Sequence, residues 1–305
     1  MVTGAGGFLG SHIAERFASS SYDVTAVGRF ATEFTRTPPG VRRFVGMTLP
    51  DRRFVDAVKR SKPDILVHCA GTASVPDSVA HPYADFQRTV DVCAFVLESL
   101  RTESPRSLFI LLSSAAVYGN PETQPIVEST PTKPVSPYGY HKLLCELLAR
   151  ESAELHGVEV AILRIFSAYG IRQRKQVIHD LFMKLCGAGE GDVELMGTGN
   201  ETRDFIHARD VATSVELIAK ERATGVFNLA SGESISISSL AAEISHALDS
   251  RKPIVFTGTR RKGDPVGWKA DIGRLRAMGF RPAVPLRQGL AEYADWYRQH
   301  CLGAH

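Results

Sequence analysis

One stretch near the start of the chain, TGAGGFLG at residues 3–10, is followed directly by an amphipathic run, Ser11–Ser19. Its glycines Gly4, Gly7 and Gly10 give the spacing G-x-x-G-x-x-G. In such a strand-to-helix turn the first glycine permits a tight bend, the second lets backbone N–H groups approach a pyrophosphate, and the third allows close helix–strand packing. Because a helix N-terminus also favours an anion, this stretch predicts a dinucleotide cradle.

Around the cradle, short apolar runs alternate with amphipathic runs through the first two-thirds of the chain. The apolar runs are typical of parallel strands buried on both faces: Val24–Val27, Ile65–Val67, Leu108–Leu112 and Val160–Leu163. The amphipathic runs favour helices: Ser11–Ser19, Asp51–Arg60, Asp85–Arg101 and Tyr138–His156. This alternation predicts a Rossmann-type α/β fold with a doubly wound parallel sheet. Only Met1 and Val2 precede the cradle, so we expect a very short first strand or a start clipped relative to a natural chain.

The last third has a different character, because Gly- and Pro-rich turns interrupt short helical and extended pieces. We expect a smaller α+β substrate-binding lobe there, and we expect Val226–Ala230 to return the chain to the main sheet. The expected division gives residues 1–165 and 201–232 to the dinucleotide-binding domain. Residues 166–200 and 233–305 then form the lobe.

The composition excludes several classes of protein. The 305 residues carry 36 Lys and Arg against 33 Asp and Glu, and this net charge of +3 is too small to indicate a nucleic-acid partner. With 44% hydrophobic residues the chain is too apolar to be disordered, yet no apolar run reaches the roughly 20 residues of a membrane helix. No two of the five cysteines lie within twenty residues of each other, so we expect reduced thiols and no metal site. No secretory signal is visible, and we expect a cytoplasmic protein.

Tyr138 and Lys142 lie one turn apart on one face of a predicted helix. A phenol with a pKa near 10 is a poor base at neutral pH, but a nearby ammonium group favours its phenolate form. Such a tyrosine takes a proton from a hydroxyl while a hydride leaves the same carbon, or works in reverse. Ser114 follows the strand Leu108–Leu112, at the sheet edge that binds ligands, and can orient the reacting oxygen. Each feature alone also fits a purely structural role: a surface pair for Tyr138 and Lys142, and a cap or turn for Ser114. Together, and behind a glycine cradle, the three residues predict catalysis.

The end of the second strand indicates which dinucleotide binds. An acidic residue there selects NAD by bonding the ribose 2′-hydroxyl, whereas an arginine accommodates the 2′-phosphate of NADP. The sequence Val27-Gly28-Arg29 contains no acid. The absence of an acid favours NADP over NAD. The alternative is that the Arg29 side chain simply points to solvent.

Six motifs, in order along nearly the whole chain, resemble those of the extended short-chain dehydrogenase/reductase superfamily, specifically its NAD(P)-dependent nucleotide-sugar epimerase/dehydratase group. The motifs are TGAGGFLG, VHCAGTASV at 67–75, SSAAVYG at 113–119, SPYGYHK at 136–142, RDFIH at 203–207 and RRKGD at 260–264. In this family the helices at Asp85–Arg101 and Tyr138–His156 pair across a dimer. The resemblance therefore implies a homodimer with an isologous four-helix contact.

The resemblance also implies roles for individual residues. The catalytic triad is Ser114, Tyr138 and Lys142. The cofactor-binding set is Gly4, Gly7, Phe8, Leu9, Gly10, Ala70 and Gly71, beside Arg29, Tyr138 and Lys142. The substrate-binding set is Ser74, Ser114, Ser167, Arg203, Arg261 and Asp264. Arginine forks suit phosphate oxygens, and an aspartate suits sugar hydroxyls.

Several positions depart from the family pattern. Ala115 and Ala116 stand where the 4,6-dehydratases of the group carry Asp and Glu, and alanines cannot transfer protons. Met47 replaces an aspartate that contacts adenine, and Ser167 replaces an asparagine near a substrate phosphate. The basic segment at residues 171–175 is a candidate to compensate for Ser167, through its two arginines.

The leading interpretation is a C4 epimerase of a nucleoside-diphosphate sugar that is UDP-, dTDP- or GDP-linked. The alternative is an NADPH-dependent 4-ketoreductase, which Arg29 favours, while Ala115 and Ala116 disfavour a dehydratase. Two further classes fit less of the sequence. A steroid- or flavonoid-type dehydrogenase is expected to lack RDFIH and RRKGD, and a non-catalytic dinucleotide sensor is expected to have lost Ser, Tyr or Lys from the triad.

Overall fold

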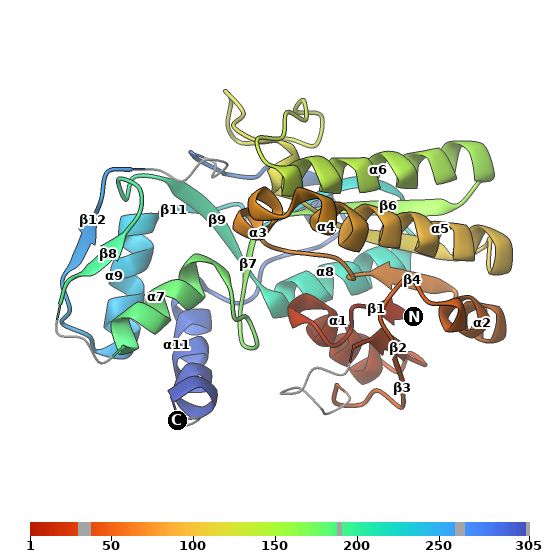
Figure 1. The fold of residues 1–305 in the computed structure, drawn as a ribbon, viewed down its shortest axis with the longest axis horizontal. Helices are drawn as coiled ribbons and strands as arrows, with labels where there is room; N and C mark the ends of the chain where they lie inside the picture. The colour runs from red at the N-terminus through yellow and green to blue at the C-terminus, as the bar shows by residue number, and fades with distance from the viewer. Residues whose placement is uncertain (30–37, 188–190, 260–265, 303–305) are drawn as a thin grey trace.

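A parallel sheet of seven strands, in the order β10-β6-β5-β4-β1-β2-β3, forms the centre of the computed structural model, which describes residues 1–29, 38–187, 191–259 and 266–302 (Figure 1). The strands are β1 (Val2–Thr3), β2 (Thr25–Gly28), β3 (Arg43–Gly46), β4 (Ile65–His68), β5 (Leu108–Ser114), β6 (Glu159–Ile165) and β10 (Gly225–Leu229). The predicted doubly wound sheet is confirmed, and β10 returns the chain to it beside β6. The first strand is indeed very short, with two residues.

Helices cover both faces of this sheet (Figure 1). On one face α1 (Phe8–Ser19) packs against α8 (Ala208–Glu221), and on the other α5 (Val92–Glu103) packs against α2 (Arg52–Ser61) and α6 (Pro137–His156). Successive strand residues alternate between the two hydrophobic cores: Leu108 and Ile110 face α1 and α8, whereas Phe109 and Leu111 face α2, α5 and α6. This alternation explains why the strands read as continuous apolar runs.

The segment predicted as one helix at Asp85–Arg101 is divided in the structure. It consists of α4 (Pro82–Phe86), a π-helical turn η1 (Gln87–Asp91) and α5, and a short helix α3 (Val75–Ala80) precedes it. Residue Thr89 lies in the π turn, where its carbonyl accepts a hydrogen bond from Cys145 Sγ at 3.6 Å and its Oγ1 accepts one from the backbone N–H of Thr72 at 3.4 Å. Contacts from other segments thus stabilise the irregular turn, which periodicity within the segment does not reveal.

The remaining elements build the expected smaller α+β lobe. Its sheets are β11-β9-β7, formed by Ser234–Ser236, Thr202–His207 and Ser167–Tyr169, and β12-β8, formed by Ile254–Phe256 and Val193–Leu195. Helices α7 (Gln176–Cys186), α9 (Ile237–Leu248) and α11 (Leu286–Tyr297) share its hydrophobic core. Three short elements complete the fold: η2 (Ala115–Val117), α10 (Gly273–Ala277), which packs on β10, and η3 (Arg298–Leu302).

Within residues 1–29, 38–187, 191–259 and 266–302, no helix is both long and apolar enough to cross a membrane. In those same ranges no three His, Cys, Asp or Glu side chains gather as metal ligands would.

Candidate active site

The glycine cradle joins β1 to α1 and is packed too tightly for side chains. The backbone N–H of Gly7 donates to the carbonyl of Gly4 at 2.9 Å, and Gly4 has a positive φ of 65°. A Cβ added at Gly10 would lie 2.2 Å from that carbonyl oxygen, and one added at Gly4 would lie 2.7 Å from the backbone nitrogen of Ala70. Gly7 is the N-cap of α1 and places no side chain on the first N–H groups of the helix. The cradle therefore fits the pyrophosphate of a dinucleotide.

The cradle lies at the ends of β1, β2 and β4, where the strand order of the sheet reverses. Ala70 and Gly71 follow β4 there, while Phe8 and Leu9 form the first turn of α1. Arg29 follows β2; its side chain is exposed, and its carbonyl would meet a Cβ on Gly6 at 2.7 Å. Ligands of doubly wound sheets bind at such a switch point.

The structure brings Tyr138 and Lys142 together at the carboxyl end of β5. The Nζ atom of Lys142 lies 5.9 Å from the centroid of the Tyr138 ring and donates to the carbonyl of Leu112 at 3.0 Å. Ser114 ends β5, and its Oγ accepts a hydrogen bond from the N–H of Ala116 at 3.2 Å. A Cβ added at Gly139 would lie 2.6 Å from the Ala116 carbonyl, so the glycine next to Tyr138 lets α6 pack directly on this turn.

Two groups at the end of β4 remain uncharged near neutral pH. Burial, helped by the charge of Lys142, lowers the pKa of His68 to about 3, and His68 Nδ1 is hydrogen-bonded to Thr3 Oγ1 at 2.9 Å. Burial raises the pKa of Cys69 to about 12, against the opposing influence of Lys142. A neutral imidazole and a protonated thiol therefore add no charge beside Lys142 at this end of the sheet.

Two contacts that the sequence does not reveal hold the start of α6. The backbone N–H of Tyr138 donates to Ser78 Oγ of α3 at 3.0 Å. His141 Nδ1 lies 2.5 Å from Asp85 Oδ2, and Asp85 also accepts a hydrogen bond from Thr72, just after the Ala70–Gly71 loop. Asp85 and Ser78 are distinguished from other polar residues only by their burial. The burial of a polar side chain cannot be predicted without knowledge of the fold.

The predicted substrate residues are divided between the two lobes. Arg203 lies on β9, with its guanidinium carbon 5.6 Å from the ring centroid of Trp268. Ser167 begins β7, which pairs with β9, and Ser74 caps α3 by accepting from the N–H of Asp77 at 3.2 Å. Ser114 lies at the end of β5, as described above. Residues Arg261 and Asp264 lie outside the described residues.

Asp204, next to Arg203, ties three segments together. Its fully buried carboxylate accepts hydrogen bonds from the N–H and Oγ of Ser231 at 2.8 and 2.7 Å and from the N–H of Gly232 at 3.1 Å. It also accepts one from the N–H of Ala270 at 3.2 Å. The loop after β10 and the segment that carries Trp268 are thereby fixed on β9, which sets the position of Trp268 beside Arg203.

The basic segment at residues 171–175 is attached to the dinucleotide-binding helix. Arg172 donates to Ser11 Oγ at 2.8 Å and to the carboxylate of Glu15 at 2.7 Å, both on α1. The guanidinium of Arg174 lies 5.9 Å from the ring centroid of Trp296 on α11. Arg172 therefore points toward α1, the helix that follows the glycine cradle.

The buried Met47 follows β3 and donates its N–H to the carbonyl of Gly28. Ala115 and Ala116 are buried as well, in the turn after Ser114. None of these three positions presents an acidic group to the site, as the sequence indicates.

Comparison with known proteins agrees with this geometry. Residues 1–230 match the NAD dependent epimerase/dehydratase family. The UDP-glucose 4-epimerase of Streptomyces lividans is 28% identical over 322 residues, covering 99% of this chain and 97% of that protein. The solved UDP-glucose 4-epimerase of Thermus thermophilus, in complex with NAD, has a TM-score of 0.88 at 26% identity, with 97% of this chain and 98% of that chain covered.

A second solved structure is similar to the same extent. The UDP-N-acetylglucosamine 4-epimerase of Methanobrevibacter ruminantium, in complex with UDP-N-acetylmuramic acid, has a TM-score of 0.87 at 28% identity, covering 98% of this chain and 97% of that chain. The family match spans well over half of the chain and includes both the cradle and the Tyr138–Lys142 pair. The chain therefore belongs to the NAD-dependent epimerase/dehydratase family of the extended short-chain dehydrogenase/reductase superfamily.

Proposed function

We propose that this protein is a 4-epimerase of a nucleoside-diphosphate sugar. The observation that carries the proposal is the contact of Lys142 with the Tyr138 ring, beside the turn that follows Ser114 and at the same sheet edge as the glycine cradle. Similarity over the full length to proteins named UDP-glucose and UDP-N-acetylglucosamine 4-epimerase supports it.

Each catalytic residue has a chemical role in this proposal. Tyr138, with Lys142 Nζ beside its ring, takes the proton of the C4 hydroxyl and later returns it. Ser114 Oγ accepts from a backbone N–H, which leaves its own proton to bond the reacting oxygen. A bound nicotinamide dinucleotide, held by the cradle, supplies a reversible hydride acceptor. Because an epimerase eliminates no water from the sugar, no proton-transferring acid is needed at Ala115 or Ala116.

The substrate diphosphate is the proposed partner of Arg203, together with Arg261, while Asp264 is the proposed partner of a ribose hydroxyl. Arg203 lies against Trp268, and the planar guanidinium of an arginine suits phosphate oxygens. UDP-linked sugars are the substrates to test first, because the similar proteins are named for UDP-sugars.

A direct assay tests the function. Purified protein is incubated with UDP-, dTDP- and GDP-sugars and a catalytic amount of NAD, and C4 isomers are separated by chromatography. We expect conversion of at least one UDP-sugar, loss of activity in Tyr138→Phe, and retained activity in Tyr140→Phe, an exposed neighbour on the same helix. If turnover requires stoichiometric NADPH and a 4-keto-sugar, the alternative function, a 4-ketoreductase, replaces the epimerase.

The choice of dinucleotide is a separate part of the proposal. Arg29 is exposed at the end of β2 and favours the 2′-phosphate of NADP, whereas the Thermus thermophilus relative is in complex with NAD. Dissociation constants of both dinucleotides, measured for the wild type and Arg29→Asp, decide between them. A role for Arg29 requires that the variant loses affinity for NADP and keeps its affinity for NAD.

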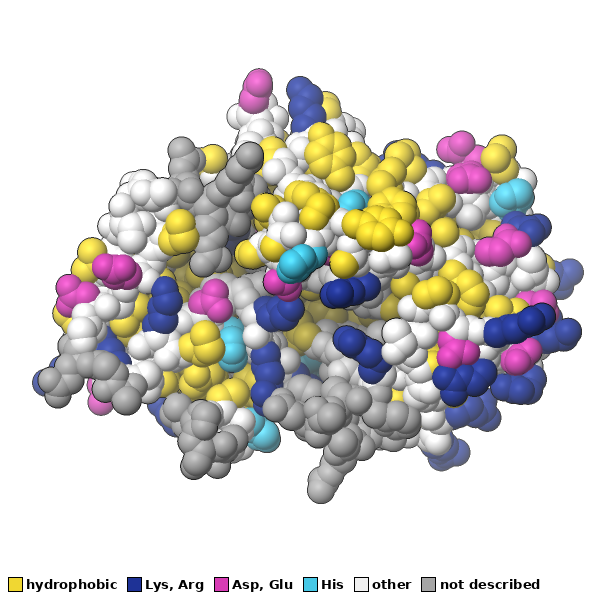
Figure 2. Space-filling view, in the orientation of Figure 1, with side chains coloured by type: hydrophobic (Ala, Val, Ile, Leu, Met, Phe, Trp, Pro, Cys, Tyr) yellow, Lys and Arg dark blue, Asp and Glu magenta, His cyan; other side chains and the backbone are white. Residues whose placement is uncertain are grey.

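The proposed homodimer uses the surface of α3, α4 and α6. Figure 2 shows apolar side chains gathered there, and their exposed fractions are large: Val79 50%, Tyr83 73%, Tyr140 55%, Leu144 37% and Leu147 49%. A contiguous apolar patch on a helical face favours burial against a second copy. Sedimentation analysis should find a dimer that Leu144→Glu with Leu147→Glu converts to a monomer, while Met183→Glu on α7 leaves it intact.

A further inference from the structure

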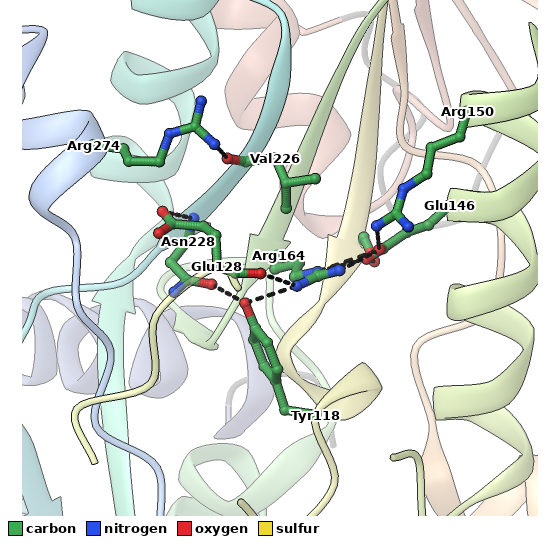
Figure 3. A network of polar contacts seen from close by, with 9 residues as sticks. Tyr118, Glu128, Glu146, Arg150, Arg164, Val226, Asn228 and Arg274 are labelled. Carbon is green, nitrogen blue, oxygen red and sulfur yellow. Dashed lines mark hydrogen bonds and ion pairs between the residues drawn. The ribbon is translucent and has the colours of Figure 1, made fainter. Parts of the chain in front are cut away.

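A buried ion pair between Arg164 and Glu146 joins α6 to the central sheet (Figure 3). The guanidinium of Arg164, on β6, donates to both carboxylate oxygens of Glu146, on α6, with distances of 2.7 to 3.2 Å. Glu146 is fully buried and Arg164 is 2% exposed. Burial by itself lowers the pKa of Arg164, but the hydrogen bonds and charge of Glu146 outweigh it and hold that pKa above its usual range.

Three consecutive residues at the end of β5 each meet a different part of the active site. The carbonyl of Leu112 accepts from Lys142 Nζ at 3.0 Å, and Ser113 Oγ donates to Glu146 Oε1 at 2.6 Å. Ser114 is the proposed catalytic serine. Ser113 is also the register partner of Arg164 on the neighbouring strand, so both side chains emerge on the face that α6 covers.

Tyr138, Lys142 and Glu146 recur every four residues along α6, and the last two are bound to successive residues of β5. A helix can slide or rotate on a sheet when only apolar side chains hold it, because dispersion contacts are not directional. Two directed polar contacts one turn apart, one of them to a buried carboxylate, remove that freedom. The register of α6 against β5 is thereby fixed next to Tyr138.

The ion pair extends the same constraint to the substrate side. Arg164 also donates to Tyr118 Oη at 3.0 Å, and Tyr118 in turn donates to Asn228 Oδ1 on β10 at 2.6 Å. Asn228 Nδ2 donates to the carbonyls of Ile126 and Asp271 at 2.8 and 3.3 Å. Asp271 lies one residue beyond Ala270, on the segment that carries Trp268, so a single network spans α6, β5, β6, β10 and that segment.

We propose that Glu146, held by Arg164, is a positioning residue that fixes the register of α6 on β5, so that Tyr138 and Lys142 stand opposite Ser114. This inference rests on the proposed function for the identity of the reaction, but the geometry that it describes does not depend on the sugar. A buried pair with no such role is replaceable by apolar residues of similar volume, often at no cost in stability. In this protein we expect the same replacement to lower kcat.

The test replaces both partners at once, because removing one would leave a buried charge. In Glu146→Leu with Arg164→Met we expect kcat to fall roughly ten- to a hundredfold while KM stays within about twofold, since misplaced catalytic groups slow chemistry more than binding. Glu146→Gln with Arg164→Gln can remake the hydrogen bonds and should recover part of the rate. Ser113→Ala, which keeps the ion pair intact, should lower kcat in the same direction and covers the case in which the double variant does not fold.

A spectroscopic comparison separates this inference from the proposed function. The near-ultraviolet circular dichroism signal that Tyr138→Phe removes is measured in the substrate-free protein, and we expect the Leu/Met variant to alter it, because the surroundings of the Tyr138 ring change when α6 shifts. The matched control is Glu159→Leu with Arg222→Met, an exposed pair at the other end of β6, which should change neither kcat nor this signal. A folded Leu/Met variant with wild-type kcat and a wild-type signal would overturn the inference. If no nucleotide sugar is converted by the wild type, this signal alone still decides it.

Discussion

The backbone N–H of Tyr138 donates a hydrogen bond to Ser78 Oγ at 3.0 Å, between residues sixty positions apart in the chain. Ser78 is completely buried, and its hydroxyl donates to the carbonyl of Val75 at 2.7 Å. The first N–H groups of a helix have no partner within the helix. Ser78 supplies one for α6 and thereby joins the start of α6, which carries Tyr138, to α3, which follows the Ala70–Gly71 loop.

Replacing Ser78 with alanine tests this junction. Ser78→Ala leaves a buried N–H without its acceptor, so we expect the free energy of unfolding in urea to fall by about 1 to 3 kcal/mol. We also expect kcat to fall, because Tyr138 loses a fixed anchor. Ser236→Ala removes the N-cap of α9 in the other lobe, which should lower stability by about 1 kcal/mol with kcat unchanged. Equal effects on kcat in the two variants would contradict the prediction.

Gly10 is the position where the cradle tolerates no side chain. In Gly10→Ala the Cβ would lie 2.2 Å from the Gly4 carbonyl, so the bend that presents the N–H groups must open. We expect NAD binding, followed by fluorescence titration, to be lost. Gly157→Ala is the control: Gly157 caps α6 with φ 68° and has nothing within 4 Å of the added Cβ, so only backbone strain remains and NAD affinity should be retained.

Acid should destabilise the fold through His12, which is buried on α1. Burial, together with the charge of neighbouring Arg172, lowers the pKa of His12 to about 4. Between that value and the ordinary pKa of 6.5 the unfolded chain binds the proton more readily, so stability is lost as pH falls through this window. His12→Gln keeps a donor for the Ile171 carbonyl and should flatten the dependence by up to about 1.4 kcal/mol per pH unit. Urea unfolding from pH 7 to pH 4 measures it, and parallel curves for the two proteins would exclude His12.

Trp268 should matter for binding rather than for the rate of chemistry. Its ring lies beside the guanidinium of Arg203, and its Nε1 donates to the carbonyl of Gly119 at 3.1 Å. Trp268→Leu removes the face on which Arg203 rests, so we expect KM for the nucleotide sugar to rise about tenfold with kcat nearly unchanged. A fall in kcat at constant KM would instead assign Trp268 to the alignment of the catalytic residues.

The cradle and the Tyr138–Lys142 pair can be predicted from sequence because residue type and spacing are local. The glycines must be glycines where the chain crosses itself within seven residues, and one helical turn brings Tyr138 to Lys142 in any fold. The central strands were predictable because burial of both faces gives continuous apolar runs, whereas the partly exposed β3, β11 and β12 give no such run.

Glu146 and Asp85 could not be recognised in the same way. In sequence each is one acidic residue among many on an amphipathic helix, where such residues are usually exposed. Their partners, Arg164 and His141, lie 18 and 56 residues away, so only the fold brings them together. Gly139 is the intermediate case: a glycine inside a helix costs stability, which signals close packing without naming the Ala116 carbonyl that requires it.

The end of β5 has a consequence for how such a protein can diversify. Leu112 and Ser113 hold α6 on a central strand of the larger sheet, whereas Arg203 and Trp268 stand on the smaller lobe. Residues 193–203 take no part in the network that joins α6 to β5, β6, β10 and the segment of Trp268. Grafting residues 193–203 from a relative is therefore a rational way to alter substrate preference while the contacts of α6 stay unchanged.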